Sequence, residues 1–205
     1  MIGIINYGSG NIQAILNIHK KLNVHAFIAN STEELTKAEK LILPGVGAFD
    51  ETMNKLISSG LIDSLNDCVL AKKTPVLGIC VGMQIMANRS DEGTMNGLGW
   101  FDAEVKKLNP VNKKGEAVLM PHMGWNSVQQ KYDSDLLNGI DPARGFYFLH
   151  SYHFVCKNED DILAETHYGD TITSAISKEN IYGTQFHPEK SHTNGIRVFK
   201  NFSEL

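Results

Sequence analysis

Residues 75–84 read Pro75-Val76-Leu77-Gly78-Ile79-Cys80-Val81-Gly82-Met83-Gln84. The apolar run after the proline is typical of a buried strand in a parallel sheet. Residues 78–82 then have the G-x-nucleophile-x-G form of a strand-to-helix elbow, which exposes its central residue at the carboxyl edge of the sheet. A short helix is expected through Ala87, so Cys80 would lie beside a helix N-terminus, where a thiolate is favoured. A buried structural cysteine is the alternative interpretation, and the rest of the chain has to decide between them.

The composition indicates a globular protein. The 205 residues are 42% hydrophobic and 20% charged, which suits a single domain spanning 1–205. The net charge of −4 and the absence of a basic run argue against nucleic acid or a membrane surface as the main partner. Three cysteines at unrelated spacings predict reduced thiols and a cytoplasmic location. The first residues, Met1–Tyr7, are expected to form a strand and not a signal peptide.

The order of elements predicts an α/β fold. In the first half, strands alternate with helical stripes, which implies a parallel sheet with helices on both faces. These strands are expected at Ile2–Ile5, Val24–Ile28, Leu41–Leu43 and Val76–Ile79. The second half has short strand-like runs separated by turn residues, which favours antiparallel strands added to the sheet. They are expected at Glu104–Leu108, Ala117–Met120, Phe146–Leu149, Tyr152–Val155, Leu163–His167 and Thr173–Ile176, and a last strand is expected at Ile181–Phe186.

Two glycine-rich turns follow predicted strands. Gly8-Ser9-Gly10 resembles the start of a dinucleotide-binding fingerprint, but the third glycine would fall at Gln13, so a tight turn is the better interpretation. Pro44-Gly45-Val46-Gly47 could direct backbone N–H groups at an anionic ligand, or could be a plain turn between strand and helix. The local sequence leaves both interpretations of the second turn open.

A second candidate motif, His187-Pro188-Glu189, follows the last predicted strand. In an extended segment residues i and i+2 point the same way, so the imidazole and the carboxylate can be neighbours. A carboxylate beside a histidine fixes its tautomer and stabilises the imidazolium, which is what a cysteine nucleophile requires. The other histidines near apolar residues (His122, His150 and His153) are expected to be hydrogen-bonded structural groups. No ligand spacing supports a metal site, and no cofactor is expected.

These motifs together resemble the class I, triad-type glutamine amidotransferases. The chain is most similar to the glutaminase subunits of imidazole glycerol phosphate synthases, through motifs spread over its whole length. They are Tyr7-Gly8-Ser9-Gly10-Asn11, residues 43–49, Pro121-His122-Met123-Gly124-Trp125-Asn126, residues 146–152 and residues 185–191. The resemblance implies a flavodoxin-like three-layer fold with a mostly parallel central sheet.

The resemblance also implies roles for individual residues. Cys80 would be the nucleophile, His187 the general acid and base, and Glu189 the residue that orients His187. Oxyanion donors would be the N–H groups of Val81 and of Val46 or Gly47, in a turn that can face the wrong way until a partner binds. The positions matching glutamine-binding residues are Gly45, Gln84, Ser151 and Tyr152.

The family delivers ammonia to a partner subunit with a (β/α)8 barrel. Positions matching residues at or near that interface are Asn11, Met123, Trp125 and Lys190. In the histidine pathway the barrel makes imidazole glycerol phosphate and an aminoimidazole carboxamide ribotide. Related subunits supply ammonia for amidation of bacterial surface sugars, and His192 after Lys190-Ser191 resembles those at least as well. A non-catalytic binding subunit is a further alternative, which the intact Cys80, His187 and Glu189 argue against.

Overall fold

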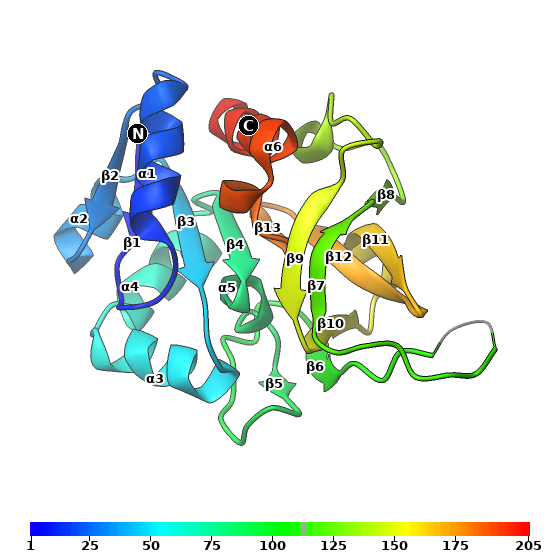
Figure 1. Cartoon of the computed structure of the whole chain (residues 1–205). Helices are drawn as coiled ribbons and strands as arrows, with labels where there is room; N and C mark the ends of the chain where they lie inside the picture. The colour runs from blue at the N-terminus through cyan, green and yellow to red at the C-terminus, as the bar shows by residue number, and fades with distance from the viewer. Residues whose placement is uncertain (112–113) are drawn as a thin grey trace.

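The computed structural model describes residues 1–111 and 114–205 (Figure 1). Its centre is an eight-stranded sheet with the strand order β2-β1-β3-β4-β13-β12-β11-β8. The first five strands in this order run parallel, and β12, β11 and β8 continue the sheet in antiparallel pairs. The strands are β1 (Ile2–Ile5), β2 (Ala26–Ala29), β3 (Lys40–Gly45), β4 (Val76–Cys80), β8 (Gln129–Gln130), β11 (Ile162–Tyr168), β12 (Asp170–Lys178) and β13 (Ile181–Thr184). The predicted α/β class with a mostly parallel sheet is confirmed.

Helices cover both faces of the parallel part. Helix α1 packs beside α6, and α2 packs beside α4 (Figure 1). The helices are α1 (Ile12–Lys21), α2 (Thr32–Lys37), α3 (Phe49–Ser58), α4 (Ile62–Asn66), α5 (Val81–Gln84) and α6 (His192–Glu204), with a π-helical turn at Asp67–Ala71. Within the described ranges, none of these helices has the length and apolar character needed to span a bilayer.

The core forms where the sequence is continuously apolar. All residues of β1 and β4 are buried, as expected for central strands covered on both faces. Helix α1 turns Ile15 inward, and α3 does the same with Phe49 and Leu56. Burying one such side chain contributes about 1.5–3 kcal/mol, so these stripes fix which face of each helix meets the sheet.

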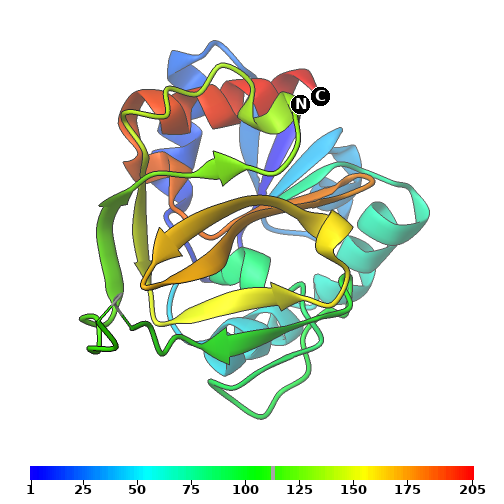
Figure 2. The same cartoon turned by 90° about the vertical axis from the view of Figure 1, so that its right-hand side faces the viewer.

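The second half differs from the sequence prediction in its pairing. Among the described residues of this half, β13 joins the central sheet parallel to β4 and β12, β11 and β8 extend it. The other strands form a three-stranded sheet, β10-β6-β5, and a two-stranded sheet, β7-β9 (Figure 2). The strand expected at Ala117–Met120 was wrong, because Ala117 makes only an isolated bridge to Val111. These strands are β5 (Arg89–Ser90), β6 (Ala103–Lys107), β7 (His122–Asn126), β9 (Phe146–His150) and β10 (Tyr152–Cys156).

The sheet topology brings three segments to one edge. Gly45 at the end of β3 is the register partner of Cys80 at the end of β4. Strand β13 lies on the other side of β4 and leads into His187. The carboxyl ends of neighbouring parallel strands are where open α/β sheets place their sites.

Candidate active site

The strand-to-helix elbow predicted at Cys80 is present. Strand β4 ends at Cys80 and α5 begins at the next residue, Val81. Cys80 has φ 54° and ψ −112°, a backbone conformation that non-glycine residues rarely adopt. Such strain costs of the order of 1–3 kcal/mol and persists only where the surrounding structure holds it. The elbow therefore presents Cys80 at the edge of the sheet although the residue is only 3% exposed.

Two glycines let the end of β3 approach this elbow. A Cβ on Gly82 would lie 2.0 Å from the carbonyl oxygen of Leu43, and one on Gly45 would lie 2.1 Å from the nitrogen of Gly82. Any side chain at either position would therefore separate β3 from the elbow. The loop that follows Gly45 is thereby held against Cys80.

His187 and Glu189 form a buried pair. The His187 Nδ1–H donates to Glu189 Oε1 at 2.8 Å, and the two side chains are 3% and 2% exposed. The backbone N–H of His187 donates to the Tyr147 carbonyl at 2.9 Å, which ties the motif to β9. The expected extended geometry holds only for His187, because Pro188–Lys190 forms a 3-10 helix. The turn, and not an extended segment, brings the carboxylate back to the imidazole.

The surroundings of His187 favour the imidazolium. Burial alone would lower its pKa, but the hydrogen bonds and charges of Cys80 and Glu189 outweigh burial and raise the pKa of His187 to about 10. At neutral pH the ring is then a cation facing the Cys80 sulfur. This arrangement can support a thiolate nucleophile and can supply a proton to a leaving group.

A cavity of about 460 Å³ opens over Cys80 and His187. Its lining residues come from the elbow, the β3 loop and the β9–β10 turn; they include Val46, Gly47, Val81, Gln84, Leu149, Ser151, Tyr152 and Lys190. A larger cavity of about 570 Å³ lies elsewhere, between β8, β12 and β13, and contains none of the three catalytic candidates. The smaller cavity is the candidate site because it contains the nucleophile and the base.

Gln84 connects two walls of this cavity. Its Nε2 donates to the Tyr152 carbonyl at 3.0 Å and to Gln185 Oε1 at 2.9 Å. Gln185 in turn points its Nε2 at the sulfur of Cys80, 3.7 Å away. Gln185 was missed in the sequence although it precedes the His187 motif by two residues. Both hydrogens of Gln84 Nε2 are used, so its Oε1 is the atom left for a ligand.

The turn after β3 has an unexpected partner. The N–H of Val46 donates to Ser9 Oγ at 3.0 Å, and the same hydroxyl donates to the Val46 carbonyl at 3.0 Å. The Val46 N–H is therefore held by Ser9 and does not point at Cys80. Gly47 lines the cavity with φ +99°, whereas Gly45 packs against the elbow and does not line it. Ser9 was interpreted from the sequence only as part of a tight turn.

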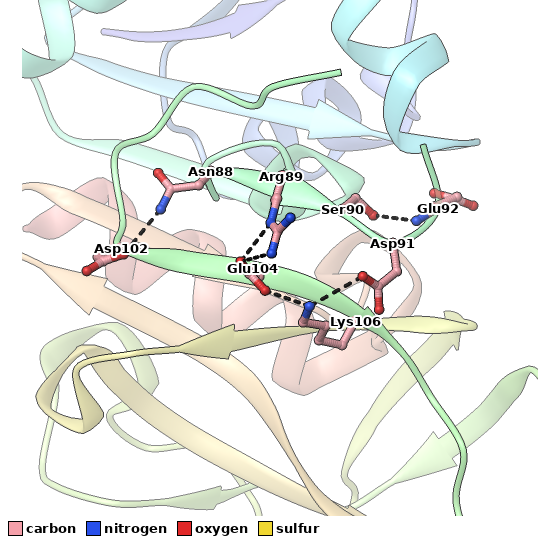
Figure 3. A network of polar contacts seen from close by, with 8 residues as sticks. All are labelled: Asn88, Arg89, Ser90, Asp91, Glu92, Asp102, Glu104 and Lys106. Atoms are coloured by element: carbon pink, nitrogen blue, oxygen red, sulfur yellow. Dashed lines mark hydrogen bonds and ion pairs between the residues drawn. The ribbon is translucent and has the colours of Figure 1, made fainter. Parts of the chain in front are cut away.

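One carboxylate in the cavity was not predicted. Glu92 also lines the cavity, and its Oε2 accepts from the N–H of Phe49 at the start of α3. Its own N–H donates to Ser90 Oγ at 3.1 Å (Figure 3). The same segment is held to β6 by a bridge between Arg89 and Glu104, 2.6 Å from Nη2 to Oε1. No local motif marked Glu92, because its contacts depend on a loop 43 residues away in the sequence.

The residues expected at a partner interface lie in three different places. Met123 and Trp125 lie on β7 with 63% and 49% of their surface exposed, and Trp125 stacks on His192 with ring centroids 5.2 Å apart. Lys190 lines the cavity and places its Nζ 5.5 Å from the centroid of the Tyr147 ring. Asn11 is exposed just before α1 and makes no side-chain cap. Of these four residues, only Lys190 lines the cavity.

The described residues offer no site for a metal. Across 1–111 and 114–205, no three His, Cys, Asp or Glu side chains are grouped closely enough to hold an ion. Two of the three histidines expected to be structural, His122 and His150, are hydrogen-bonded to one another.

Comparison with known proteins agrees with this geometry. The family described as Glutamine amidotransferase class-I matches residues 3–204. The chain is 48% identical to the imidazole glycerol phosphate synthase subunit HisH of Leptospira borgpetersenii and 46% identical to the subunit named HisH 2 of Pseudomonas aeruginosa, over the full length of each. Among solved structures, a putative GMP synthase protein from Thermoplasma acidophilum has the same fold, with a TM-score of 0.72 at 23% identity, covering 99% of this chain and 92% of that one. The chain belongs to the class I glutamine amidotransferase family, in the branch of the HisH subunits of imidazole glycerol phosphate synthase.

Proposed function

We propose that this chain is the glutaminase subunit of imidazole glycerol phosphate synthase in histidine biosynthesis, acting as one domain over residues 1–205. It hydrolyses the side-chain amide of glutamine to glutamate and ammonia. The observation that carries the proposal is the strained Cys80 elbow facing a buried His187–Glu189 pair in one cavity. Its three cysteines are free thiols, consistent with a reducing compartment, and we assign the chain to the cytoplasm.

The chemistry follows from the protonation of the pair. Cys80 Sγ attacks the carboxamide carbon of glutamine, and the C–N bond breaks as His187 gives its proton to the departing ammonia. The neutral imidazole then removes a proton from water, which attacks the γ-glutamyl thioester and releases glutamate and the thiolate. Glu189 accepts from Nδ1 throughout, so Nε2 is the nitrogen that exchanges protons with substrate and water.

Polar groups in the cavity match the free amino acid. The α-ammonium of glutamine needs acceptors, and both Glu92 and Gln84, whose Oε1 is not used by the hydrogen bonds of its Nε2, line the cavity. The β9–β10 turn at Ser151 and Tyr152 forms another wall against which the substrate can lie. A charged acceptor would favour glutamine over an analogue without the α-amino group.

Ser9 holds the oxyanion turn in a resting position. The N–H of Val81, next to the nucleophile, can serve as one donor to the tetrahedral oxyanion. A second donor, from Val46 or Gly47, becomes available when the Val46 peptide leaves Ser9 and turns toward Cys80. One such donor contributes about 3–4 kcal/mol to transition-state stabilisation, so the isolated chain would be slow.

We expect Ser9→Ala to raise the glutaminase rate of the isolated chain. The variant removes both hydrogen bonds to Val46, each with a net contribution of about 0.5–1.5 kcal/mol, so the turn samples its active position roughly tenfold more often. Ser9→Thr, which keeps the hydroxyl, is the control. If the isolated Ser9→Ala chain hydrolyses glutamine at the same rate as the isolated wild-type chain, Ser9 does not restrain the turn.

The partner that we propose is a (β/α)8 barrel synthase that receives ammonia directly. Released into water, ammonia would be protonated and would lose its nucleophilicity. Met123 and Trp125 expose apolar surface on β7, and Lys190, which lines the cavity, lies over the Tyr147 ring that Trp125 also contacts. Aromatic and methionine side chains of this kind are enriched at protein interfaces. Asn11 is proposed to lie at the rim of the same contact.

The test is a glutaminase assay of the purified chain with and without its barrel subunit. The rate is expected to be low alone and to rise about 10²–10³-fold in the complex, because the second oxyanion donor then becomes available. Glutaramate, which lacks the α-amino group, is the control substrate and should react much more slowly. Full activity in the isolated chain would exclude the gated turn.

The same complex identifies the acceptor. Ammonia-dependent synthesis is measured with the phosphoribulosyl-formimino nucleotide and, in parallel, with a sugar acceptor. Turnover of the nucleotide is the expected result. Turnover of the sugar alone would instead assign the chain to surface-sugar amidation.

A further inference from the structure

Two buried histidines outside the catalytic pair are in direct contact. His122 begins β7 and His150 ends β9, and they are register partners across the two strands. His122 Nδ1 lies 2.9 Å from His150 Nε2, and the residues are 2% and 7% exposed. His150 also lines the catalytic cavity. Neither ring takes part in the proposed thioester chemistry.

The hydrogen bonds assign the protons of this pair. His150 Nδ1 lies 2.8 Å from the Tyr152 carbonyl, which can only accept, so His150 carries its proton on Nδ1. In a neutral ring Nε2 is then an acceptor, and His122 must donate from its own Nδ1. His122 Nε2 in turn accepts from Asn126 Nδ2 at 3.2 Å. Asn126 is fixed in this orientation because its Oδ1 accepts from the N–H of Ser127.

Both rings are held in the neutral form by their surroundings. Burial lowers the pKa of His122 to about 4. Burial also lowers the pKa of His150 to about 3, against the opposing effect of the Tyr152 carbonyl. The titratable groups that act on His150 are His122, His153 and His187, and the positive form of each lowers its pKa further. A second proton on His150 would set two donors against each other across the pair, and a second proton on His122 would set its Nε2–H against the Asn126 Nδ2 amide.

Packing holds His122 in place. Its ring is stacked against Phe148 and against Tyr168, with centroid distances of 4.5 and 4.0 Å. The Tyr168 hydroxyl donates to the Leu119 carbonyl at 2.7 Å, so this side of the stack is itself anchored. The ring can therefore neither turn nor withdraw without disturbing β7 and β9.

A chain of polar contacts connects the histidine pair to the nucleophile through the Tyr152 carbonyl, Gln84 and Gln185. The Tyr152 carbonyl that accepts from His150 also accepts from Gln84 Nε2 at 3.0 Å. Gln84 then donates to Gln185, whose Nε2 points at Cys80 Sγ. The position of one carbonyl thus sets both the β9–β10 turn and the Gln84 side chain.

We propose that His122 and His150 are positioning residues for glutamine binding: a neutral imidazole pair that fixes the Tyr152 carbonyl and, through it, the Gln84 side chain. The proposal rests on the proposed glutaminase function. The pair touches no reacting atom, and it acts by keeping the glutamine-binding wall in one conformation. Because β7 also presents Met123 and Trp125, the same hydrogen bond ties this wall to the strand that faces the proposed partner.

The kinetic test compares two substitutions of His150 in the complex with the barrel subunit. In His150→Asn the amide nitrogen takes the place of Nδ1 and keeps the donor to Tyr152, whereas in His150→Gln the amide replaces Nε2 and this donor is lost. We expect KM for glutamine to rise about tenfold or more in His150→Gln, and about threefold in His150→Asn, which keeps the donor to Tyr152 and loses only the hydrogen bond from His122, with kcat nearly unchanged in both. Thermal unfolding of both variants is measured alongside. Equal effects on KM, or effects that follow the loss of thermal stability, would overturn the proposal.

A second measurement needs no activity. Nitrogen-15 NMR of the isolated, histidine-labelled chain should show both rings as neutral Nδ1–H tautomers at pH 5–7, with a scalar coupling between His122 Nδ1 and His150 Nε2 through the hydrogen bond. An Nε2–H tautomer for either ring, or titration of either ring within this range, would show that the two rings do not form the proposed neutral hydrogen-bonded pair. If the NMR result holds but the complex never hydrolyses glutamine, the proposed function fails and the pair remains. If the complex is active and the two variants do not differ, the positioning role fails.

Discussion

Replacing Cys80 with alanine is expected to abolish glutamine-dependent synthesis while leaving synthesis from added ammonium salts intact. The glutamine-dependent rate should fall by about 10⁴-fold or more, because no other nucleophile can form the thioester. Alanine is close in size to cysteine, and the barrel partner still receives ammonia from solution. The loss is therefore specific to the step in which the C–N bond of glutamine breaks.

The control for this variant is Cys156→Ala. Cys156 lies at the end of β10, and burial raises the pKa of its thiol to about 12, so it is a poor nucleophile at neutral pH. Cys156→Ala should retain both activities. Co-purification of the Cys80→Ala chain with the barrel subunit shows that the variant folds and binds its partner. Continued use of glutamine by Cys80→Ala would mean that the nucleophile is another residue.

The parallel half of the fold could be read from the sequence because local pattern and burial agree there. Val76-Leu77 and Ile79 form a run that only a central strand can bury, and the following elbow fixes where that strand ends. The stripe that includes Ile15 predicted α1 for the same reason. In this half each segment has the secondary structure and the buried face that its hydrophobic periodicity predicts.

The antiparallel half was harder because its strands depart from that pattern. Strand β7 turns the polar His122 inward and exposes Met123 and Trp125, which is the reverse of the usual alternation. Sequence periodicity therefore indicated no strand there and placed one at Ala117–Met120 instead. His122 faces inward on β7 because it pairs with His150 on β9, and this contact is evident only in the structure.

The residues of the candidate site also differ in how far the sequence could predict them. Cys80 and His187 belong to local motifs, so their spacing and type could be recognised before any contact was known. Ser9 and Glu92 act on segments 37 and 43 residues away, and nothing in their immediate sequence indicates the contact. Long-range hydrogen bonds to backbone groups leave no periodic pattern, so the resting position of the Val46 turn could be found only in three dimensions.

Replacing Glu189 with glutamine is expected to lower kcat by about 10³–10⁴-fold while leaving the cavity intact. Glu189 Oε1 accepts from His187 Nδ1, and Oε2 is buried with no hydrogen-bond partner among the described residues. If the glutamine amide nitrogen takes the Oε1 position, it faces Nδ1 as a donor and forces the proton to Nε2. The ring can then no longer accept the Cys80 proton. If the amide nitrogen takes the other position, it is a buried donor without an acceptor.

The Glu189→Gln substitution should also shift the pH profile of kcat in a definite direction. Glu189 is one of the two groups that raise the pKa of His187 to about 10, so its neutralisation must lower that pKa. The imidazolium then loses its proton at lower pH, and the alkaline limb of the kcat profile in the complex should move down from near pH 10. Glu159→Gln, at a carboxylate that is 86% exposed, should leave the alkaline limb in place. A Glu189→Gln profile that coincides with wild type would remove Glu189 from the mechanism and would leave the raised pKa of His187 to Cys80 alone.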